Sequence, residues 1–186
     1  IVDALADGAS VTASILAGER AASDCGAQDV RTLFSVDRGR TLTPFTTPID
    51  TLVTPLQVYV AVRQSNYWAE GFALFFDQPH QAAEKASALL QLALAAIKPG
   101  AKVADVARQI AAATPPYRAH PVTARAFANV VGLALEEPPH SNIGATFVAG
   151  EIYSVRVGVT DDAQGHAIVS AMVRCRDDGR NDTFWS

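Results

Sequence analysis

The run from Asn129 to Gly158 constrains the fold of this chain more than any other stretch. Its first half, Val130 to Leu135, is an apolar β-like run that ends at two glutamates and two prolines. Its second half, Glu151 to Val159, alternates as a strand does and carries Arg156 among apolar and small neighbours. A buried cation needs a partner, because an unpaired charge is costly to bury. The partner of Arg156 is therefore the main question that the sequence poses.

The length of the chain predicts one domain. A protein of 186 residues buries roughly 70% of the surface that its unfolded chain exposes, which is enough for a core without covalent staples. We expect residues 1–186 to form that single domain. Because the chain opens on Ile1 rather than Met, we also expect a processed chain, truncated at the N-terminus, or part of a longer protein.

Charge and composition exclude several classes of partner. The formal net charge is -4 and no cluster of Lys and Arg occurs, so we expect no nucleic acid partner. No apolar run approaches the roughly 20 residues that cross a bilayer, so we expect no membrane partner. Cys25 and Cys175 lack metal or redox spacing. We expect both to be buried as small apolar residues in a cytoplasmic protein.

Periodicity and turn signals predict helices and strands in an α+β order. The predicted helices cover residues 1–16, 18–24, 78–97 and 103–113, the third with Asp77 as N-cap and Pro79 in its first turn. The predicted strands cover residues 29–37, 56–62, 67–76, 130–135, 151–159 and 165–178. Strands 56–62 and 67–76 form a hairpin, whereas 38–55 is a proline-broken loop or edge and 114–125 a connector. A turn at Gly179 precedes a short aromatic tail.

Four segments carry a family resemblance through their order and spacing. They are IKPGAKVADVARQI at 97–110, VVGLALEEPP at 130–139, AGEIYSVRVG at 149–158 and VYVAVRQSNYWAEGFALFF at 58–76. These resemble, in turn, the Lys-Pro-Gly helix joint, the His-Glu-x-Pro segment, the Glu-Pro-Gly strand and the Asp-bearing hairpin of the creatinase, aminopeptidase P and methionine aminopeptidase family. The resemblance implies the pita-bread fold, an α+β fold in which helices cover one side of a curved antiparallel sheet.

The same resemblance implies a site for two metal ions, held in the family by two Asp, one His and two Glu. Matched position by position, those ligands fall on Tyr59, Glu70, Asn129, Arg156 and Ser170. Only Glu70 keeps a carboxylate, and a pair of divalent cations needs several carboxylates and an imidazole. The guanidinium of Arg156 has no lone pair to give and repels a cation. We therefore expect a degenerate member with no metal and no cofactor.

The proton-handling histidines of the family are also replaced. The histidine of the His-Glu-x-Pro segment corresponds to Glu136, and the histidine upstream of the hairpin has no counterpart because the first histidine here is His80. Creatinase, which works without metal, uses that upstream histidine as its acid and base. Glu136 and Glu137 form an alternative acid and base pair, but successive strand residues point to opposite faces.

The pair of Glu70 and Arg156 is the centre of the candidate site. These positions face each other across the metals of the family, so a charge-assisted pair can occupy the vacated volume. The pair is either a buried salt bridge that plugs the site or an arginine that grips a ligand carboxylate. Tyr59 and Ser170 offer hydroxyl groups without a neighbouring base to activate them, so we expect them to be hydrogen-bonded fillers.

We expect the histidines to lie on the surface. A new metal site built from two of them and Asp161 or Asp162 lacks ligand spacing. The histidines are His80, His120, His140 and His166.

Three hypotheses for function follow. The first is a peptidase-like domain that binds a small ligand or a protein partner without catalysis, as a homodimer or within a longer chain. The second is a metal-independent hydrolase or lyase acting on a small carboxylate or guanidino compound, with Arg156 as anchor and Glu70 or Glu136 as acid and base. The third is a structural subunit that dimerises with an active paralogue.

Overall fold

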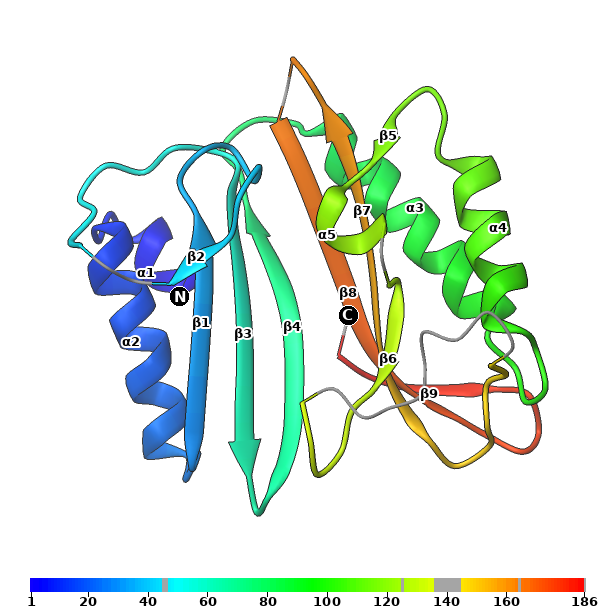
Figure 1. Cartoon of the computed structure of the whole chain (residues 1–186). Coiled ribbons are helices and arrows are strands. Elements are labelled where there is room, and N and C mark those ends of the chain that lie inside the picture. The colour runs from blue at the N-terminus through cyan, green and yellow to red at the C-terminus, as the bar shows by residue number, and fades with distance from the viewer. Residues whose placement is uncertain (45–46, 125, 136–144, 164, 186) are drawn as a thin grey trace.

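Two antiparallel sheets and five helices make up the described part of the chain in this computed structural model, which covers residues 1–44, 47–124, 126–135, 145–163 and 165–185 (Figure 1). The elements are α1 (Val2–Ala6), α2 (Val11–Asp24), β1 (Asp29–Ser35), β2 (Thr43–Pro44), β3 (Leu56–Gln64), β4 (Tyr67–Phe75), α3 (Gln81–Ala96), α4 (Val103–Ala113), β5 (Arg118–Ala119), α5 (Pro121–Ala124), β6 (Ala128–Val130), β7 (Ile152–Asp161), β8 (Gly165–Cys175) and β9 (Asn181–Trp185).

Each sheet is built around one antiparallel hairpin. The first sheet has the order β2-β1-β3-β4, and the second has the order β5-β7-β8-β9 with β6 also paired to β7. The β3 and β4 hairpin turns at Ser65 and Asn66, whose φ angles of 50° and 69° match the right-handed twist of the flanking strands. The predicted hairpin over 56–76 is therefore confirmed.

The two sheets meet where β4 lies beside β8. The amide of Phe72 donates to Ser170 Oγ at 2.8 Å, and the amide of Glu70 donates to Met172 Sδ at 3.4 Å. A small apolar cluster of Ala61, Trp68, Val131 and Met172 fills the junction. The outer edge of β4 thus bonds to side chains of β8 instead of to another strand backbone.

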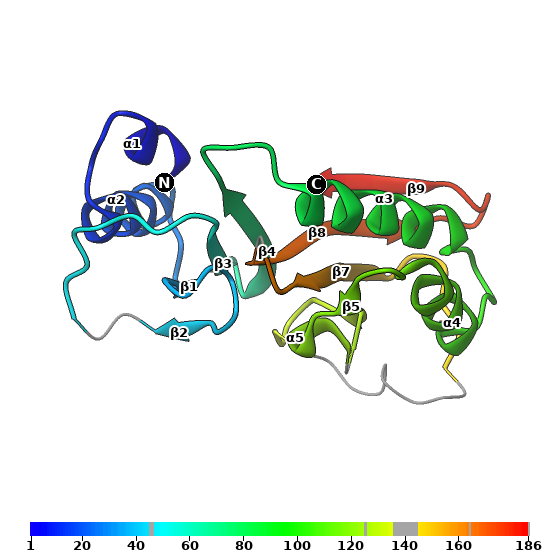
Figure 2. The same ribbon diagram turned by 90° about the horizontal axis from the view of Figure 1, so that it is seen from above.

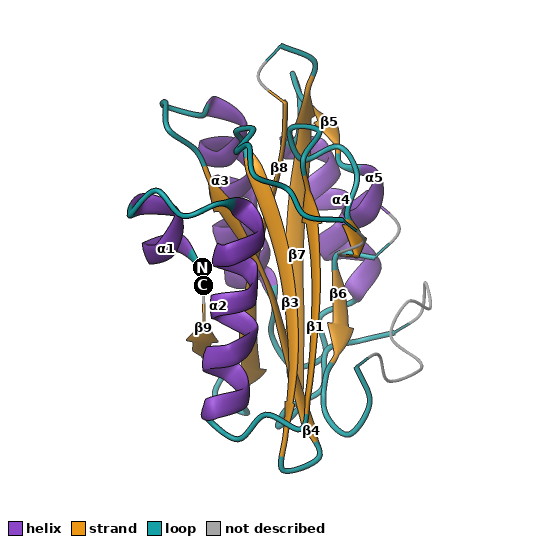
Figure 3. Cartoon of the chain, turned by 90° about the vertical axis from the view of Figure 1, so that its left-hand side faces the viewer, coloured by secondary structure: helices purple, strands orange, loops and turns teal. Residues whose placement is uncertain are grey.

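The helices α1, α2 and α3 lie on one side of the strands. Figure 2 shows α1 and α2 over the first sheet and α3 over the second, on the same side. Figure 3 shows the short α5 together with β6 on the opposite side. Two separate cores result: one between α1, α2 and the first sheet, and a larger one between α3, α4 and the second sheet. The α+β class predicted from the sequence is confirmed.

The opening segment differs from its prediction. Residues 1–16 were expected to form one helix, but Gly8 has a φ of +83°, which a right-handed helix does not allow. Ser10 then caps a new helix by accepting a hydrogen bond from the amide of Ala13 at 3.2 Å. That helix, α2, runs without a break from Val11 to Asp24.

The start of the long helix also differs. His80, not Asp77, caps α3, because its Nδ1 accepts a hydrogen bond from the amide of Ala83 at 3.1 Å. Asp77 instead accepts a hydrogen bond from Thr54 Oγ1 at 2.8 Å. Pro79 therefore lies before the helix and not in its first turn. The prediction for 103–113 matches α4.

The apolar run 130–135 is a strand only at its first residue. The ladder of β6 ends at Val130, after which the carbonyl of Gly132 accepts a hydrogen bond from the amide of Trp68 at 2.8 Å. The chain leaves β7 in order to bridge to β4.

The connector 114–125 contains β5 and α5, and the aromatic tail pairs with β8 as β9.

Two expectations about burial are wrong. Cys25 is exposed, because it stands at the end of α2 beyond the packed face, although Cys175 is buried as expected. Three of the histidines are buried rather than on the surface, because the ring nitrogens of each form hydrogen bonds inside the fold: His80, His120 and His166. His140 lies outside the described residues.

Among the residues that the structure describes, none of the helices is long and apolar enough to span a bilayer.

Candidate functional site

Glu70 lies at the middle of β4 and points away from α2. The residue is 5% exposed. Val58 on the neighbouring strand packs in the core beneath α2, so the alternate residues Tyr59 and Ala61 face the other side. Ala61 stands opposite Glu70 in the register of the hairpin. Tyr59 and Glu70 therefore share the face that is turned away from α2.

Arg156 reaches Glu70 from the second sheet. Its Nη1 lies 3.3 Å from Glu70 Oε1, and the two side chains are 11% and 2% exposed. Its Nε donates to the carbonyl of Ala126 at 3.3 Å. The expected pair is thus formed, and the backbone before β6 holds the guanidinium in place.

Two further candidate residues donate to the same carboxylate. The hydroxyl of Tyr59 makes a short hydrogen bond to Glu70 Oε2. The amide nitrogen of Asn129 lies 3.4 Å from Glu70 Oε1 and also 3.4 Å from the carbonyls of Val130 and Leu135. Both oxygens of Glu70 therefore receive hydrogen bonds, and three elements supply the donors.

Ser170 lies next to this cluster but has a different role. It stands opposite Arg156 in the pairing of β7 and β8, and its Oγ accepts the hydrogen bond from the Phe72 amide. Ser170 therefore joins β8 to β4. Glu136 and Glu137 lie outside the described residues, so the acid and base hypothesis for them stays a prediction.

A buried histidine pair is the feature that the sequence analysis missed. The ring of His120 packs edge-on against that of His166, with centroids 5.4 Å apart. The Nε2 of His120 lies 3.0 Å from the carbonyl of Gly39, and its Nδ1 accepts from the amide of Val122 at 3.1 Å. A neutral imidazole satisfies both contacts, and burial lowers the pKa of both rings. Nothing in the local spacing of these residues signals the contact, since they come from distant segments.

Comparison with solved structures identifies the architecture. The chain is similar to the X-Pro aminopeptidase of Thermotoga maritima, with 13% identity and a TM-score of 0.65 over 88% of this chain and 49% of that one. It is similar to a variant of Escherichia coli aminopeptidase P, with 11% identity and a TM-score of 0.67 over 87% of this chain and 45% of that one. The chain has the pita-bread fold. A methionine aminopeptidase from Thermotoga maritima shares the fold at 13% identity and a TM-score of 0.65, over 82% of this chain and 72% of that one.

The likeness is one of fold, because the sequence identities are low. No family model and no curated protein matches the sequence. This pita-bread chain spans about half the length of the first solved structures that it matches.

The residues present do not fit the dinuclear metal centre that the resemblance implies. Around Glu70 this pita-bread domain places a phenol, a carboxamide and a guanidinium, and the guanidinium carries the charge that a cation would carry. Within the described ranges, no group of three or more His, Cys, Asp and Glu side chains is arranged to hold a metal ion. The only carboxylate among the five matched positions is already engaged by donors.

Proposed function

We propose that this pita-bread domain is a peptidase-like module that binds a small ligand or a protein partner and carries no dinuclear metal centre. The chemistry of a metallopeptidase needs side chains whose lone pairs coordinate the metal ions, and an open coordination position on the metal. The matched positions offer donors of hydrogen bonds in their place.

The single observation that carries the proposal is the state of Glu70. Its carboxylate receives hydrogen bonds from Tyr59, Asn129 and Arg156. The positive charge of Arg156 balances the carboxylate at 3.3 Å, as a metal ion does in an active site. The carboxylate of Glu70 therefore has its hydrogen-bond donors and its balancing charge from the protein alone.

The burial of Arg156 favours a module over a metal-independent enzyme. The enzyme hypothesis requires a guanidinium that solvent and substrate reach. The side chain of Arg156 is 11% exposed, and Ala126 and Glu70 already accept from it. These contacts support the hypothesis in which the pair plugs the site.

Metal binding tests the proposal directly. The purified protein is incubated with Mn²⁺, Co²⁺ or Zn²⁺, dialysed and analysed by inductively coupled plasma mass spectrometry. We expect no stoichiometric metal and no hydrolysis of Xaa-Pro or Met-peptide substrates. About two equivalents of metal per chain together with peptide cleavage, the stoichiometry of a two-metal site, would overturn the proposal.

A variant with restored ligands provides the matched comparison. It carries Tyr59→Asp, Glu70→Asp, Asn129→His, Arg156→Glu and Ser170→Glu. We expect this variant, once shown to be folded by circular dichroism, to retain metal after dialysis. A folded variant that retains none would show that the ligand positions are assigned wrongly.

The partner and the location of the module remain predictions. We expect a homodimer, which light scattering coupled to size-exclusion chromatography measures directly, and a cytoplasmic location, which cell fractionation tests. A monomer at micromolar concentration would contradict the first expectation.

A further inference from the structure

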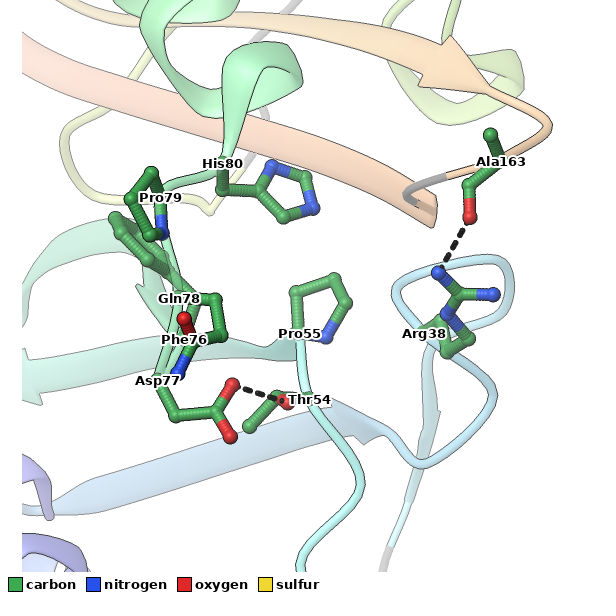
Figure 4. Close-up of a pocket in the computed structure, with 9 residues that line it drawn as sticks. All are labelled: Arg38, Thr54, Pro55, Phe76, Asp77, Gln78, Pro79, His80 and Ala163. Atoms are coloured by element: carbon green, nitrogen blue, oxygen red, sulfur yellow. Dashed lines mark hydrogen bonds between the residues drawn. The ribbon is translucent and has the colours of Figure 1, made fainter.

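A cavity lies apart from the Glu70 cluster, at the end of the sheets where β4 runs into α3. It has a volume of about 300 Å³, at the lower end of the range for ligand sites. Four segments line it: the loop after β1, the segment before β3, the segment between β4 and α3, and the turn after β7 (Figure 4). It is built from described residues and shares none with the Glu70 cluster.

Two opposite charges line this cavity without an ion-pair partner in the described part of the chain. Arg38 donates from Nη2 to the carbonyl of Ala163 at 2.6 Å, and Asp77 accepts from Thr54 Oγ1 at 2.8 Å. Figure 4 shows the two charged groups on opposite sides of Pro55. A guanidinium and a carboxylate that line one cavity but do not pair with each other can each bind a ligand group of opposite charge.

Both charged groups are held in place before any ligand arrives. The carbonyl of Arg38 accepts a hydrogen bond from the amide of His166 at 2.9 Å, which ties the backbone of the loop to β8. Thr54 ties the Asp77 side chain to the segment before β3. Binding to prepositioned groups costs less ordering of side chains.

Part of the cavity wall is apolar. Pro55, Phe76 and Pro79 contribute to it, and Phe76 is 43% exposed although it is aromatic. The ring of His80 lies tilted beside that of Phe76 with centroids 5.8 Å apart, and Figure 4 shows it turned toward the space above Pro55. An apolar ligand side chain would cover this exposed aromatic surface.

We propose that this cavity binds a small zwitterion, an amino acid or dipeptide with an apolar side chain. Its carboxylate pairs with Arg38, its ammonium group pairs with Asp77, and its side chain packs on Phe76 and the prolines. A simple anion lacks a group for Asp77, and a simple cation lacks a group for Arg38. The charge pattern therefore selects a ligand that carries both.

The test is a titration of the ¹⁵N-labelled protein followed by NMR. The probes are leucine and leucylleucine, with N-acetylleucine and leucinamide as analogues that lack one charge each. We expect a zwitterionic probe to shift the amides of Arg38, Asp77 and Gln78 in a saturable way. Each analogue should bind roughly two- to fivefold more weakly, because each loses one ion pair with an exposed side chain. Equal shifts with all four probes, or none at millimolar concentration, would overturn the proposal.

Matched variants assign the binding to the two charges. Asp77→Asn keeps an acceptor for Thr54, and Arg38→Gln removes the guanidinium. Each should weaken leucine binding by the same roughly two- to fivefold factor. Asp24→Asn and Arg20→Gln on α2 alter exposed charges away from the cavity and should leave binding unchanged. If Arg38→Gln fails to fold, Arg38→Lys keeps a cation, so it should retain part of the affinity. Unchanged affinity in Asp77→Asn would overturn the proposal by itself. Because the metal measurement concerns other residues, the outcomes of the two proposals are independent.

Discussion

Glu70 shows how a single position changes the chemistry of a site. The resemblance matches its carboxylate to a metal ligand, but a guanidinium from β7 and a phenol from β3 donate hydrogen bonds to its oxygens. The attraction between such charges is strong only when both are shielded from water, as here, where the exposed fractions are 11% and 2%. The stability of the fold therefore depends on keeping both charges, because either one alone would be buried without a partner.

Removal of Arg156 should destabilise the protein. In Arg156→Met the carboxylate of Glu70 stays buried without its cation, so we expect the free energy of unfolding to fall by about 3 to 5 kcal/mol. Urea denaturation followed by circular dichroism measures the loss. The double variant Glu70→Met with Arg156→Met leaves no buried charge, so it should lose less than the single variant.

An exposed arginine serves as the control for this experiment. Arg118 pairs with Asp162, but the two side chains are 69% and 81% exposed. Arg118→Met should change stability little, because solvent screens such pairs. Equal losses in Arg156→Met and Arg118→Met would show that the Glu70 pair is not shielded as the structure indicates.

At the scale of elements, the joint between β4 and β8 depends on side chains. The amides of Glu70 and Phe72 point to β8, where Met172 Sδ and Ser170 Oγ accept from them. A sulfur is a weak acceptor. Ser170 Oγ is therefore the stronger of these two acceptors on β8.

Loss of the Ser170 hydroxyl should weaken the joint. In Ser170→Ala the buried amide of Phe72 loses its acceptor, and we expect a loss of about 1 to 3 kcal/mol in the free energy of unfolding. Hydrogen exchange of the Phe72 amide should also become faster. Ser170→Thr keeps the hydroxyl and should restore slow exchange. If the Phe72 amide exchanges equally slowly in Ser170→Ala, another group satisfies it.

Elements whose residues show a clear periodicity were predictable from the sequence. Element ends that depend on contacts between distant segments were not. The hairpin and α4 follow from alternation, turn residues and helical periodicity alone. The break at Gly8 and the His80 cap depend on a positive φ and on a side chain that competes with Asp77 for the cap. Asp77 loses that competition because Thr54, distant in sequence, binds it.

At the scale of the whole molecule, the loop after β1 is fastened to the second sheet by the histidine pair. His120 contacts the carbonyl of Gly39, and a Cβ on Gly39 would lie 2.6 Å from the carbonyl oxygen of His166. Glycine is therefore required at this close approach. The contact joins one half of the molecule to the other.

The joint should weaken as the pH falls. Burial lowers the pKa of His120 below its ordinary value of 6.5, and burial together with Arg40 lowers that of His166, while Asp37 opposes the change in both. Below about pH 6.5 these histidines become protonated in the unfolded chain while they stay neutral in the folded protein. Acid therefore favours unfolding. We expect the free energy of unfolding to decrease from about pH 7.5 to about pH 5.5 in urea titrations.

A double variant isolates the histidine contribution. His120→Gln with His166→Gln removes both titrating rings, while a glutamine amide retains a donor for Gly39. We expect the dependence of stability on pH to flatten over this interval. The same slope in the variant and the parent protein would mean that other groups cause it.

The sequence by itself determined the α+β order and the pita-bread resemblance, since these depend on periodicity and on residue types at matched positions. Tertiary structure alone decided how the remaining residues are used. It placed Tyr59, Asn129 and Arg156 around one carboxylate, buried the His120 pair and set Arg38 and Asp77 on one cavity. The physical reason is that hydrogen bonds and burial depend on segments far apart in the chain, whose approach no local pattern encodes.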